Sequence, residues 1–204
     1  MFLFFDTETT GIPDWHTPSD DPRQPHIIEL GAVLTDKDLN PVNEVSLIVR
    51  PDGWTISDEI AQMTGISQDY AERFGVSEEL AVDALLELWR GGGGRVRVAH
   101  NEPFDARIVR IALKRARVDD DMLEAWKEAP RFCTQAKSKK IVNAPATQKM
   151  IEAGRKGPKS PKLSEAYEHF TGKPMKDAHR AMADVRATIE VYRHLSPLLA
   201  DKAA

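Results

Sequence analysis

Apolar and branched side chains near the start of the chain follow the spacing of β-strands. Phe2–Phe5 is a continuous apolar run, His26–Leu34 is rich in branched side chains, and Asn43–Arg50 alternates between apolar and polar positions. The proline- and aspartate-rich stretch Ile12–Pro25 separates the first two and is typical of an exposed loop. We therefore expect three strands here, with a loop insertion at residues 12–25.

The spacing then changes to that of helices. It predicts a further strand at Arg95–Ala99 and four helices, at Ser77–Trp89, Glu102–Arg117, Lys162–Phe170 and Asp177–Leu195. Four glycines at 91–94 are expected to end the first helix, and Asn101 is of a type that caps the second. This order predicts an α/β fold in which helices pack on a mixed sheet. We expect a single domain over residues 1–198 and a short tail at 199–204.

Composition excludes several classes of protein. With 204 residues, 41% hydrophobic and 29% charged, the chain is neither collagen-like nor wholly disordered. No apolar run reaches the roughly 20 residues that span a bilayer, and the N-terminus lacks the basic leader of a signal peptide. The one cysteine, Cys133, allows no internal disulfide and no cysteine-based zinc site. We expect a cytoplasmic protein with no membrane partner.

Positive charge is concentrated in one stretch, residues 131–162, which we call the basic segment. Nine lysines and arginines and a single acid, Glu152, give it a formal charge of +8, so the net charge of −4 leaves −12 for the remainder. Such a segment can follow a phosphate backbone, which makes nucleic acid a candidate partner. A solvated surface loop is an equally good explanation of charge alone.

Asp6 and Glu8 come directly after the first apolar run. Because side chains alternate along a strand, both lie on the same face. Two carboxylates held together near a core repel each other unless cations compensate them. The alternative is that the strand simply ends here and Thr9–Gly11 forms a turn.

Two further motifs place acids beside predicted helices. In HNEPFD, residues 100–105, Asp105 shares a helix face with Ile108 and Val109 and so points to the buried side. In HRAMAD, residues 179–184, His179 lies near a helix start and Asp184 lies within the helix. Alternatively, Asp105 interacts only with its helix dipole, and His179 is a surface or capping residue.

Taken together, the four carboxylates favour a metal site. Asp6, Glu8, Asp105 and Asp184 each lie at an element end or on a buried face. Oxygen ligands favour Mg²⁺ or Mn²⁺ over zinc. Two such ions roughly 3.5–4 Å apart support in-line displacement at a phosphate.

DTETTG (6–11), HNEPFD and HRAMAD, in this order, resemble the three motifs of the DEDDh branch of the 3′–5′ exonucleases, which includes proofreading and ribonuclease T-like enzymes. The resemblance extends from Phe2 to about Tyr192. It implies a ribonuclease H-like fold, a mixed five-stranded sheet flanked by helices. It also implies removal of nucleoside 5′-monophosphates one at a time from a 3′ end.

The resemblance implies roles for individual residues. Asp6, Glu8 and Asp184 would hold one of two Mg²⁺ ions, for which Mn²⁺ can substitute. Asp6 would also help to hold the second ion, with Asp105 contributing directly or through water. His179 would be the general base, since an imidazole can accept a proton near neutral pH. Substrate-binding residues would be Thr9, Gly11, Ile12, Asn101 and Phe104, with core packing as the rival explanation for Phe104.

The resemblance leaves substrate and partners open. We expect the 3′ end of a single-stranded nucleic acid, with DNA favoured over an RNA-specific activity. Relatives either bind a polymerase or form homodimers, and the lack of an obvious docking tail after Leu195 favours a free-standing enzyme. The basic segment resembles an insertion found in some relatives, for which we expect a role in guiding the strand. A non-catalytic nucleic-acid-binding or polymerase-accessory module on the same fold is the alternative, although it has no need to retain all five catalytic residues.

Overall fold

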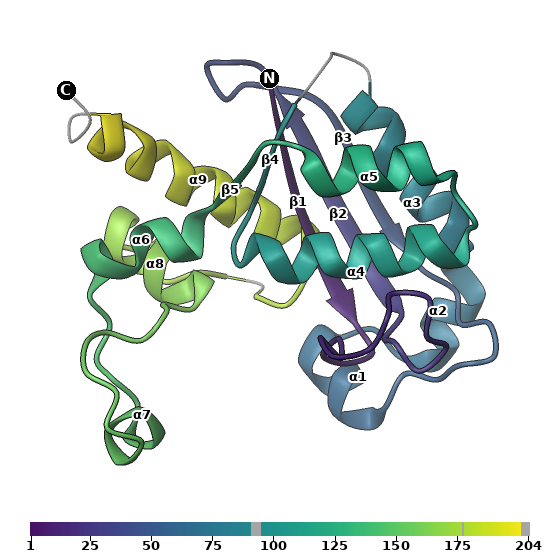
Figure 1. The fold of residues 1–204 in the computed structure, drawn as a ribbon, viewed down its shortest axis with the longest axis horizontal. Coiled ribbons are helices and arrows are strands. Elements are labelled where there is room, and N and C mark those ends of the chain that lie inside the picture. The colour runs from purple at the N-terminus through teal and green to yellow at the C-terminus, as the bar shows by residue number, and fades with distance from the viewer. Residues whose placement is uncertain (91–94, 177, 201–204) are drawn as a thin grey trace.

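A computed structural model describes residues 1–90, 95–176 and 178–200, and its five strands form one mixed sheet (Figure 1). The order across the sheet is β3-β2-β1-β4-β5. β1 is antiparallel to β2 and parallel to β4. The strands are β1 (Phe2–Thr9), β2 (Ile27–Thr35), β3 (Pro41–Ile48), β4 (Val96–Ala99) and β5 (Arg131–Cys133). The α/β class and the five-stranded mixed sheet are thus confirmed.

Strand β1 is longer than its apolar run. Asp6 pairs with Gly31 and Glu8 with Glu29 on β2, so the strand continues to Thr9. The alternative interpretation, in which the strand ends at these acids and Thr9–Gly11 forms a turn, is wrong for Thr9, which is the last residue of the strand. Polar residues can continue a strand when its backbone groups still pair with a neighbour, which apolar periodicity alone does not reveal.

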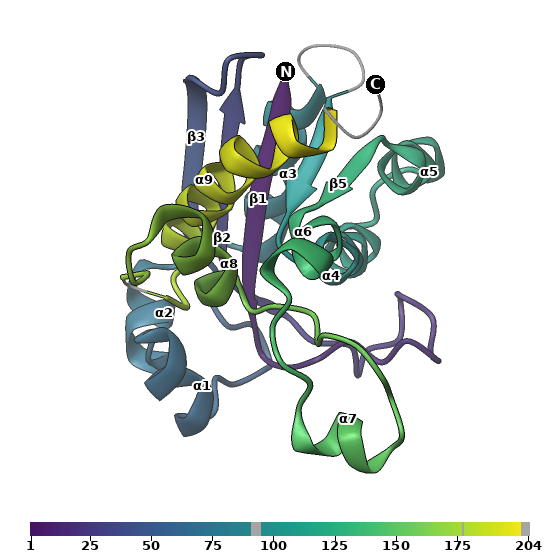
Figure 2. The same cartoon turned by 90° about the vertical axis from the view of Figure 1, so that its left-hand side faces the viewer.

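The sheet is covered on both faces (Figures 1 and 2). Leu3 and Phe5 pack in one buried cluster with residues of α3 (Glu78–Arg90), α4 (Glu102–Arg115) and α5 (Asp120–Glu128). Phe4 packs on the other face with Val185 and Tyr192 of α9 (Ala181–Ala200). Because side chains alternate along β1, the even-numbered positions that follow Phe4 face α9 as well.

Two predicted helix boundaries need correction. Helix α9 begins at Ala181 rather than at residue 177, which lies outside the described residues, as do the glycines at 91–94. Asn101 occupies the N-cap position of α4, but it has a left-handed φ of 74° and its side chain makes no capping hydrogen bond. Among the described residues, no helix has both the length and the apolar character needed to cross a membrane.

The sequence pattern also missed two short helices beyond β3. Helices α1 (Asp58–Thr64) and α2 (Gln68–Phe74) begin at Ser57 and Ser67, whose hydroxyls accept hydrogen bonds from backbone N–H groups in the first turn. Between β1 and β2, loop 12–25 is organised by the buried side chain of Gln24, which donates to the Asp14 carbonyl and the Thr17 hydroxyl. The loop contains no helix or strand, as expected.

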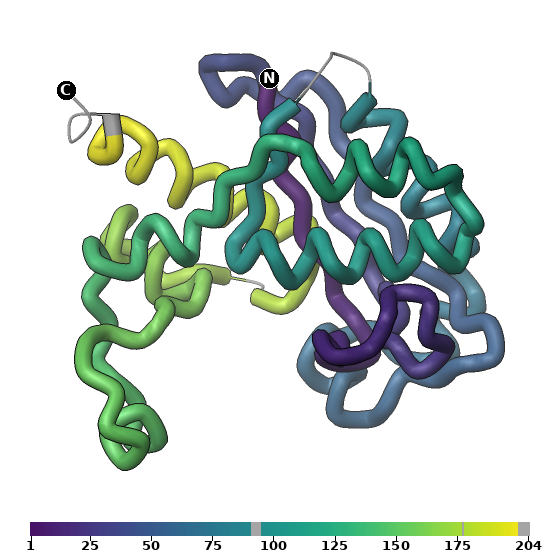
Figure 3. Tube along the Cα trace, in the orientation of Figure 1, coloured from purple at the N-terminus to yellow at the C-terminus, as the bar shows by residue number. Residues whose placement is uncertain are grey.

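The basic segment is not a simple loop. It contains β5, α6 (Thr134–Val142) and α7 (Gln148–Glu152), and it leads into α8 (Leu163–Thr171). Figure 3 shows the chain running outward from the body to α7 and back again.

Candidate active site

The start of α9 packs against β2 beside the carboxyl end of β1. Gly31 of β2 makes this possible, because a Cβ atom there would lie 2.8 Å from the backbone carbon of Ala181. Such a distance is too short for a side chain. The first turn of α9 can therefore approach the sheet closely, beside the position where Asp6 pairs with Gly31.

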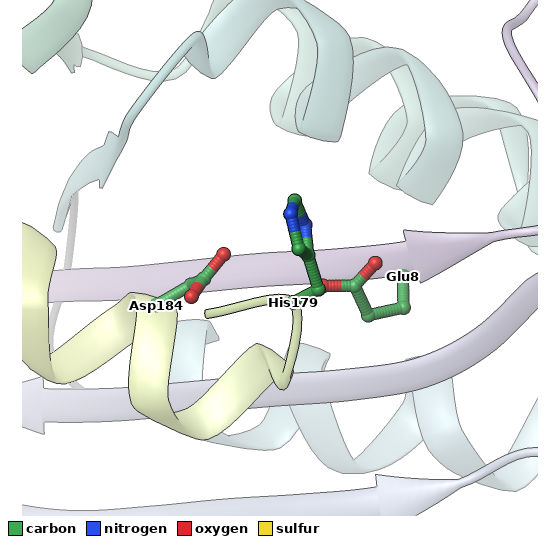
Figure 4. Close-up of side chains that lie close together, drawn as sticks. All are labelled: Glu8, His179 and Asp184. Carbon is green, nitrogen blue, oxygen red and sulfur yellow. The ribbon is translucent and has the colours of Figure 1, made fainter. Parts of the chain in front are cut away.

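Glu8, His179 and Asp184 form a cluster whose ligand atoms all lie within 4.8 Å of one another. Figure 4 shows the side chains of Glu8 and Asp184 on either side of His179. Glu8 is buried, Asp184 is half-buried and His179 is exposed. His179 lies two residues before α9 and has a left-handed φ of 68°, a conformation that is uncommon outside glycine.

Asp6 is part of the same electrostatic environment. Burial and the neighbouring carboxylates of Asp105 and Asp184, followed by Glu8, raise the pKa of Asp6 well above its usual range. Like charges in a poorly solvated position disfavour ionisation. The structure therefore places Asp6 where a cation would relieve repulsion.

The pKa values of the two acids in the cluster, Glu8 and Asp184, are raised as well. Burial first, and then the Asp184 carboxylate, raise the pKa of Glu8 to about 7. Burial raises the pKa of Asp184 to about 6, against the effect of a hydrogen bond from the His179 backbone. The Oδ1 atom of Asp184 is buried and has no hydrogen-bond partner among the residues that the structure describes. A buried acceptor without a donor fits a site for a hard divalent cation.

Asp105 reaches this region from α4. Burial raises its pKa to about 8, although hydrogen bonds from Thr7 oppose the rise. The backbone N–H and hydroxyl of Thr7 donate to Oδ1 of Asp105 at 3.0 and 2.9 Å. Thr7 is not predicted from the sequence, because a threonine in a strand has no distinguishing pattern of its own. Asp105 is buried, as the helical spacing predicted.

Glu29 is a second residue of this region that is not predicted from the sequence. It is 1% exposed and accepts hydrogen bonds from the Arg180 guanidinium and from the backbone N–H of Ala181, the latter at 2.9 Å. These bonds hold the first residue of α9 and the residue after His179 against β2. A lone carboxylate within the otherwise apolar run IIELGAV was the available signal.

Glu102, the other acid of the HNEPFD motif, lies in a different environment from Asp105. Glu102 forms a buried ion pair with Arg97 of β4 at 3.0 Å, and each side chain is 1% exposed. The Arg97 guanidinium also lies 4.3 Å from the centre of the Trp126 ring. This pair joins the first turn of α4 to β4 and so fixes the helix that carries Asp105.

The residues expected to bind substrate differ in exposure. Ile12 is 82% exposed and free to contact a ligand, whereas the buried Thr9 hydroxyl donates to the Gly11 carbonyl at 2.8 Å. Asn101 is exposed at the start of α4. Phe104 is half-buried and packs against the core below α4, which favours core packing as its main role.

Comparison with known proteins gives consistent matches. The RNase_T family model, described as "Exonuclease", matches residues 3–192. The polymerase named DNA polymerase III PolC-type is 30% identical over 191 residues in Thermotoga petrophila and 29% in Thermotoga maritima. Each alignment covers 94% of this chain and 11% of the polymerase, so the chain spans about a tenth of these relatives' length.

Solved structures show the same fold. E. coli exonuclease I in complexes with dA16 and dT13 oligonucleotides superimposes with TM-scores of 0.70 and 0.72 at 23% identity. The match covers 98% of this chain and 42% of exonuclease I. The fold, the grouped carboxylates at the end of β1 and the family match over residues 3–192 lead to one conclusion: the chain belongs to the exonuclease family, in agreement with the DEDDh resemblance of its three motifs.

Proposed function

We propose that the chain is a metal-dependent 3′–5′ exonuclease that hydrolyses single-stranded nucleic acid, with DNA favoured over RNA. The main support is the group of acids with raised pKa values at the carboxyl end of β1, beside His179. On this proposal residues 1–198 form a single exonuclease domain.

The carboxylates are suited to hold divalent cations. Asp6, Glu8 and Asp184 would hold them directly, and Asp105 would contribute directly or through water. Two Mg²⁺ ions, or Mn²⁺ in their place, would neutralise charge on the scissile phosphate and make an attacking water more acidic. The buried, unpartnered Oδ1 of Asp184 is the structural observation that supports this assignment.

His179 is the proposed general base. Its exposure and its position beside Glu8 and Asp184 leave a ring nitrogen available to accept a proton from the attacking water. The leaving 3′-oxygen would take a proton from water, and His179 would return its proton to the solvent. The products would be a nucleoside 5′-monophosphate and a strand shortened by one nucleotide that ends in a 3′-hydroxyl. Glu29 would act as a positioning residue, since its bonds to Arg180 and Ala181 fix the backbone that carries His179.

DNA is the favoured substrate for two reasons outside the site. The polymerase relatives are named as DNA polymerases, and the exonuclease I structures contain dA16 and dT13. The alternative is an RNA-specific enzyme, which would need a contact to the 2′-hydroxyl. The protein partner would be either a polymerase or a second copy of the chain.

The decisive experiment is degradation of 5′-labelled single-stranded DNA and RNA of matched sequence, in Mg²⁺, Mn²⁺ or EDTA. We expect a ladder that shortens from the 3′ end with either metal, stops in EDTA and forms faster on DNA. His179→Ala should slow it by about 10²–10⁴-fold, the usual contribution of a general base.

His169→Ala is the matched control, because His169 is an exposed histidine of α8 outside the cluster. It should retain wild-type rates. No shortening of either strand in any metal would overturn the proposal in favour of a non-catalytic binding module, and faster shortening of RNA would reverse the substrate preference.

A further inference from the structure

Most cations of the basic segment have no acidic partner. Lys159 is paired with Glu165 of α8 at 2.5 Å. Within the described parts of the chain, no ion pair is formed by the other eight: Arg131, Lys137, Lys139, Lys140, Lys149, Arg155, Lys156 and Lys162. The single acid, Glu152, accepts a hydrogen bond from Gln148 rather than from a cation. The segment therefore presents its positive charge to the solvent.

Three of these cations lie in or just after α7. Lys149, Arg155 and Lys156 are all exposed there, and Figure 2 shows α7 projecting well beyond the sheet and its covering helices. Like charges gathered on one projection repel each other and do not stabilise the fold. Their grouping is explained by an anionic partner that neutralises several of them together.

The base of the segment is fixed by His100, which directly follows β4. Its ring lies 2.9 Å from the Thr134 hydroxyl and 3.1 Å from the Pro161 carbonyl, so one histidine holds both ends of the segment. Burial lowers the pKa of His100 to about 4. The ring is therefore neutral at pH 7, and Nε2 can donate to Pro161 while Nδ1 accepts from Thr134. His100 begins the HNEPFD motif that supplies Asp105.

Further bonds make the projection a defined structure rather than a loose loop. The side chain of Gln135 donates to the Pro161 carbonyl at 3.2 Å, and the backbone N–H of Lys159 donates to the Ala144 carbonyl at 3.1 Å. The outgoing and returning chains are thus joined at the base and again further out. Helix α7 lies toward the same end of the molecule as the carboxyl end of β1 (Figure 1).

The part of the chain outside the basic segment is strongly negative. The candidate site gathers four carboxylates, and the chain outside the segment carries a formal charge of −12. Metal ions can neutralise the site itself, but a polyanion approaching the molecule is repelled by the remaining acids. The basic segment can supply attraction at longer range, because its formal charge is +8 and its cations other than Lys159 form no ion pair among the described residues.

We infer that the basic segment binds the phosphate backbone of the nucleic-acid strand whose 3′ end enters the active site. This inference rests on the proposed function. The segment contacts phosphates rather than bases, because its one aromatic residue, Phe132, packs against Tyr192 at 4.8 Å between ring centres. Binding through the segment is therefore independent of base sequence and of the sugar.

The test is the salt dependence of binding for Lys149→Ser/Arg155→Ser/Lys156→Ser. The probe is a fluorescent 20-nucleotide oligothymidylate in EDTA, followed by anisotropy. Removing three phosphate contacts should lower the slope of log affinity against log salt by about two, at roughly 0.7 per contact on a single strand. The matching oligouridylate should lose the same amount.

The matched control is Lys37→Ser/Arg90→Ser/Lys127→Ser, which removes the same charge from exposed positions outside the segment. Its slope should remain that of the wild type. Equal slopes in all three proteins, or an equal loss in both variants, would overturn the inference, and the first result would leave an acidic protein as the partner of the segment.

Catalysis provides a second, separate readout. The ratio of kcat/KM for the 20-mer to kcat/KM for the p-nitrophenyl ester of thymidine 5′-monophosphate should fall at least fivefold in the segment variant. An unchanged ratio would count against the inference. If wild-type protein hydrolyses neither substrate, the proposed function fails, while the salt slopes still decide whether the segment binds the strand.

Discussion

Two groups of acids lie on the central strands and on the helices that pack against them, and they differ in their partners. Glu102 and Glu29 are each paired with an arginine, at 3.0 Å to Arg97 and 2.9 Å to Arg180. The second group, Asp6, Glu8, Asp105 and Asp184, makes no ion pair with a lysine or arginine among the described residues, and its pKa values are raised.

This difference in pairing distinguishes acids that stabilise the fold from acids that serve the reaction. A paired buried acid joins two elements and is compensated within the chain. A group of unpaired acids lowers the stability of the fold and is explained by a ligand that supplies the missing positive charge. Substitutions of the unpaired acids are therefore expected to lower the activity of the protein, and substitutions of the paired acids to lower its stability.

The largest effect should come from Asp184→Asn. We expect hydrolysis to fall on the order of a thousandfold, because electrostatic stabilisation of the phosphate at the metal site is lost. The metal-free protein should be at least as resistant to urea as the wild type, since repulsion with Asp6 and Glu8 is removed. Single-turnover kinetics and urea unfolding in EDTA measure the two quantities.

Glu190→Gln is the control for this change, because Glu190 lies on the same helix and forms only an exposed pair with Arg193 at 3.6 Å. It should change neither quantity. An Asp184→Asn protein that is active, or that unfolds at much lower urea, would place Asp184 with the paired structural acids.

Glu102→Gln should show the opposite behaviour. It leaves the Arg97 guanidinium buried without a counter-charge, which typically costs about 3–5 kcal/mol of unfolding free energy. Activity per folded molecule should fall only a few-fold. Urea unfolding gives the stability, and Glu44→Gln, which breaks the exposed pair with Arg186, should cost less than about 1 kcal/mol.

Changing both partners sharpens this test. Arg97→Met/Glu102→Leu removes both charges and should recover most of the stability that the single change loses. If the double variant is no more stable than Glu102→Gln, the loss reflects packing around Trp126 rather than an unpaired charge.

The smallest expected effect is the pH dependence of the stability of the metal-free protein. The pKa values of Glu8, Asp105 and Asp184 are raised to about 7, 8 and 6 by burial. Between pH 4 and 8 the folded chain therefore holds more protons than the unfolded chain at these positions, so their contribution to stability is lost as pH rises through this range. Thermal unfolding in EDTA should show it.

Mn²⁺ should restore stability most strongly at the upper end of that range, because the cation neutralises the ionised acids. In Asp105→Asn the decline with pH should be shallower. A metal-free melting temperature that rises steadily from pH 5 to 8 would contradict the assignment.

The sequence predicted the central strands and all three motifs because both depend on local patterns. Apolar runs identified β1, β2 and β4, and the spacing of acids placed Asp105 on a buried face. Helices α5, α6 and α7 and the three-residue β5 were missed because they are short and largely polar, with tertiary contacts rather than periodicity fixing them.

The start of α9 shows a different limit. Helical spacing continues upstream of Ala181, but His179 adopts a left-handed φ and Glu29 accepts the N–H of Ala181, so the helix begins later. The hydrogen bond to Ala181 depends on a residue 152 positions away in the chain. Glu29 and Thr7 were missed for the same reason, since their roles exist only once β1, β2, α4 and α9 are assembled.

The backbone hydrogen bond from Lys159 to Ala144 closes the loop that contains α7. It lets the residues inside this loop change in evolution independently of the rest of the protein. These residues leave and re-enter the protein at one backbone hydrogen bond, so their number can change at small entropic cost. The tip around α7 can then be lengthened, trimmed or exchanged between relatives while β4, α8 and the carboxylates keep their places. Substrate affinity can thus diversify, or be engineered by grafting, without altering the chemistry of the site.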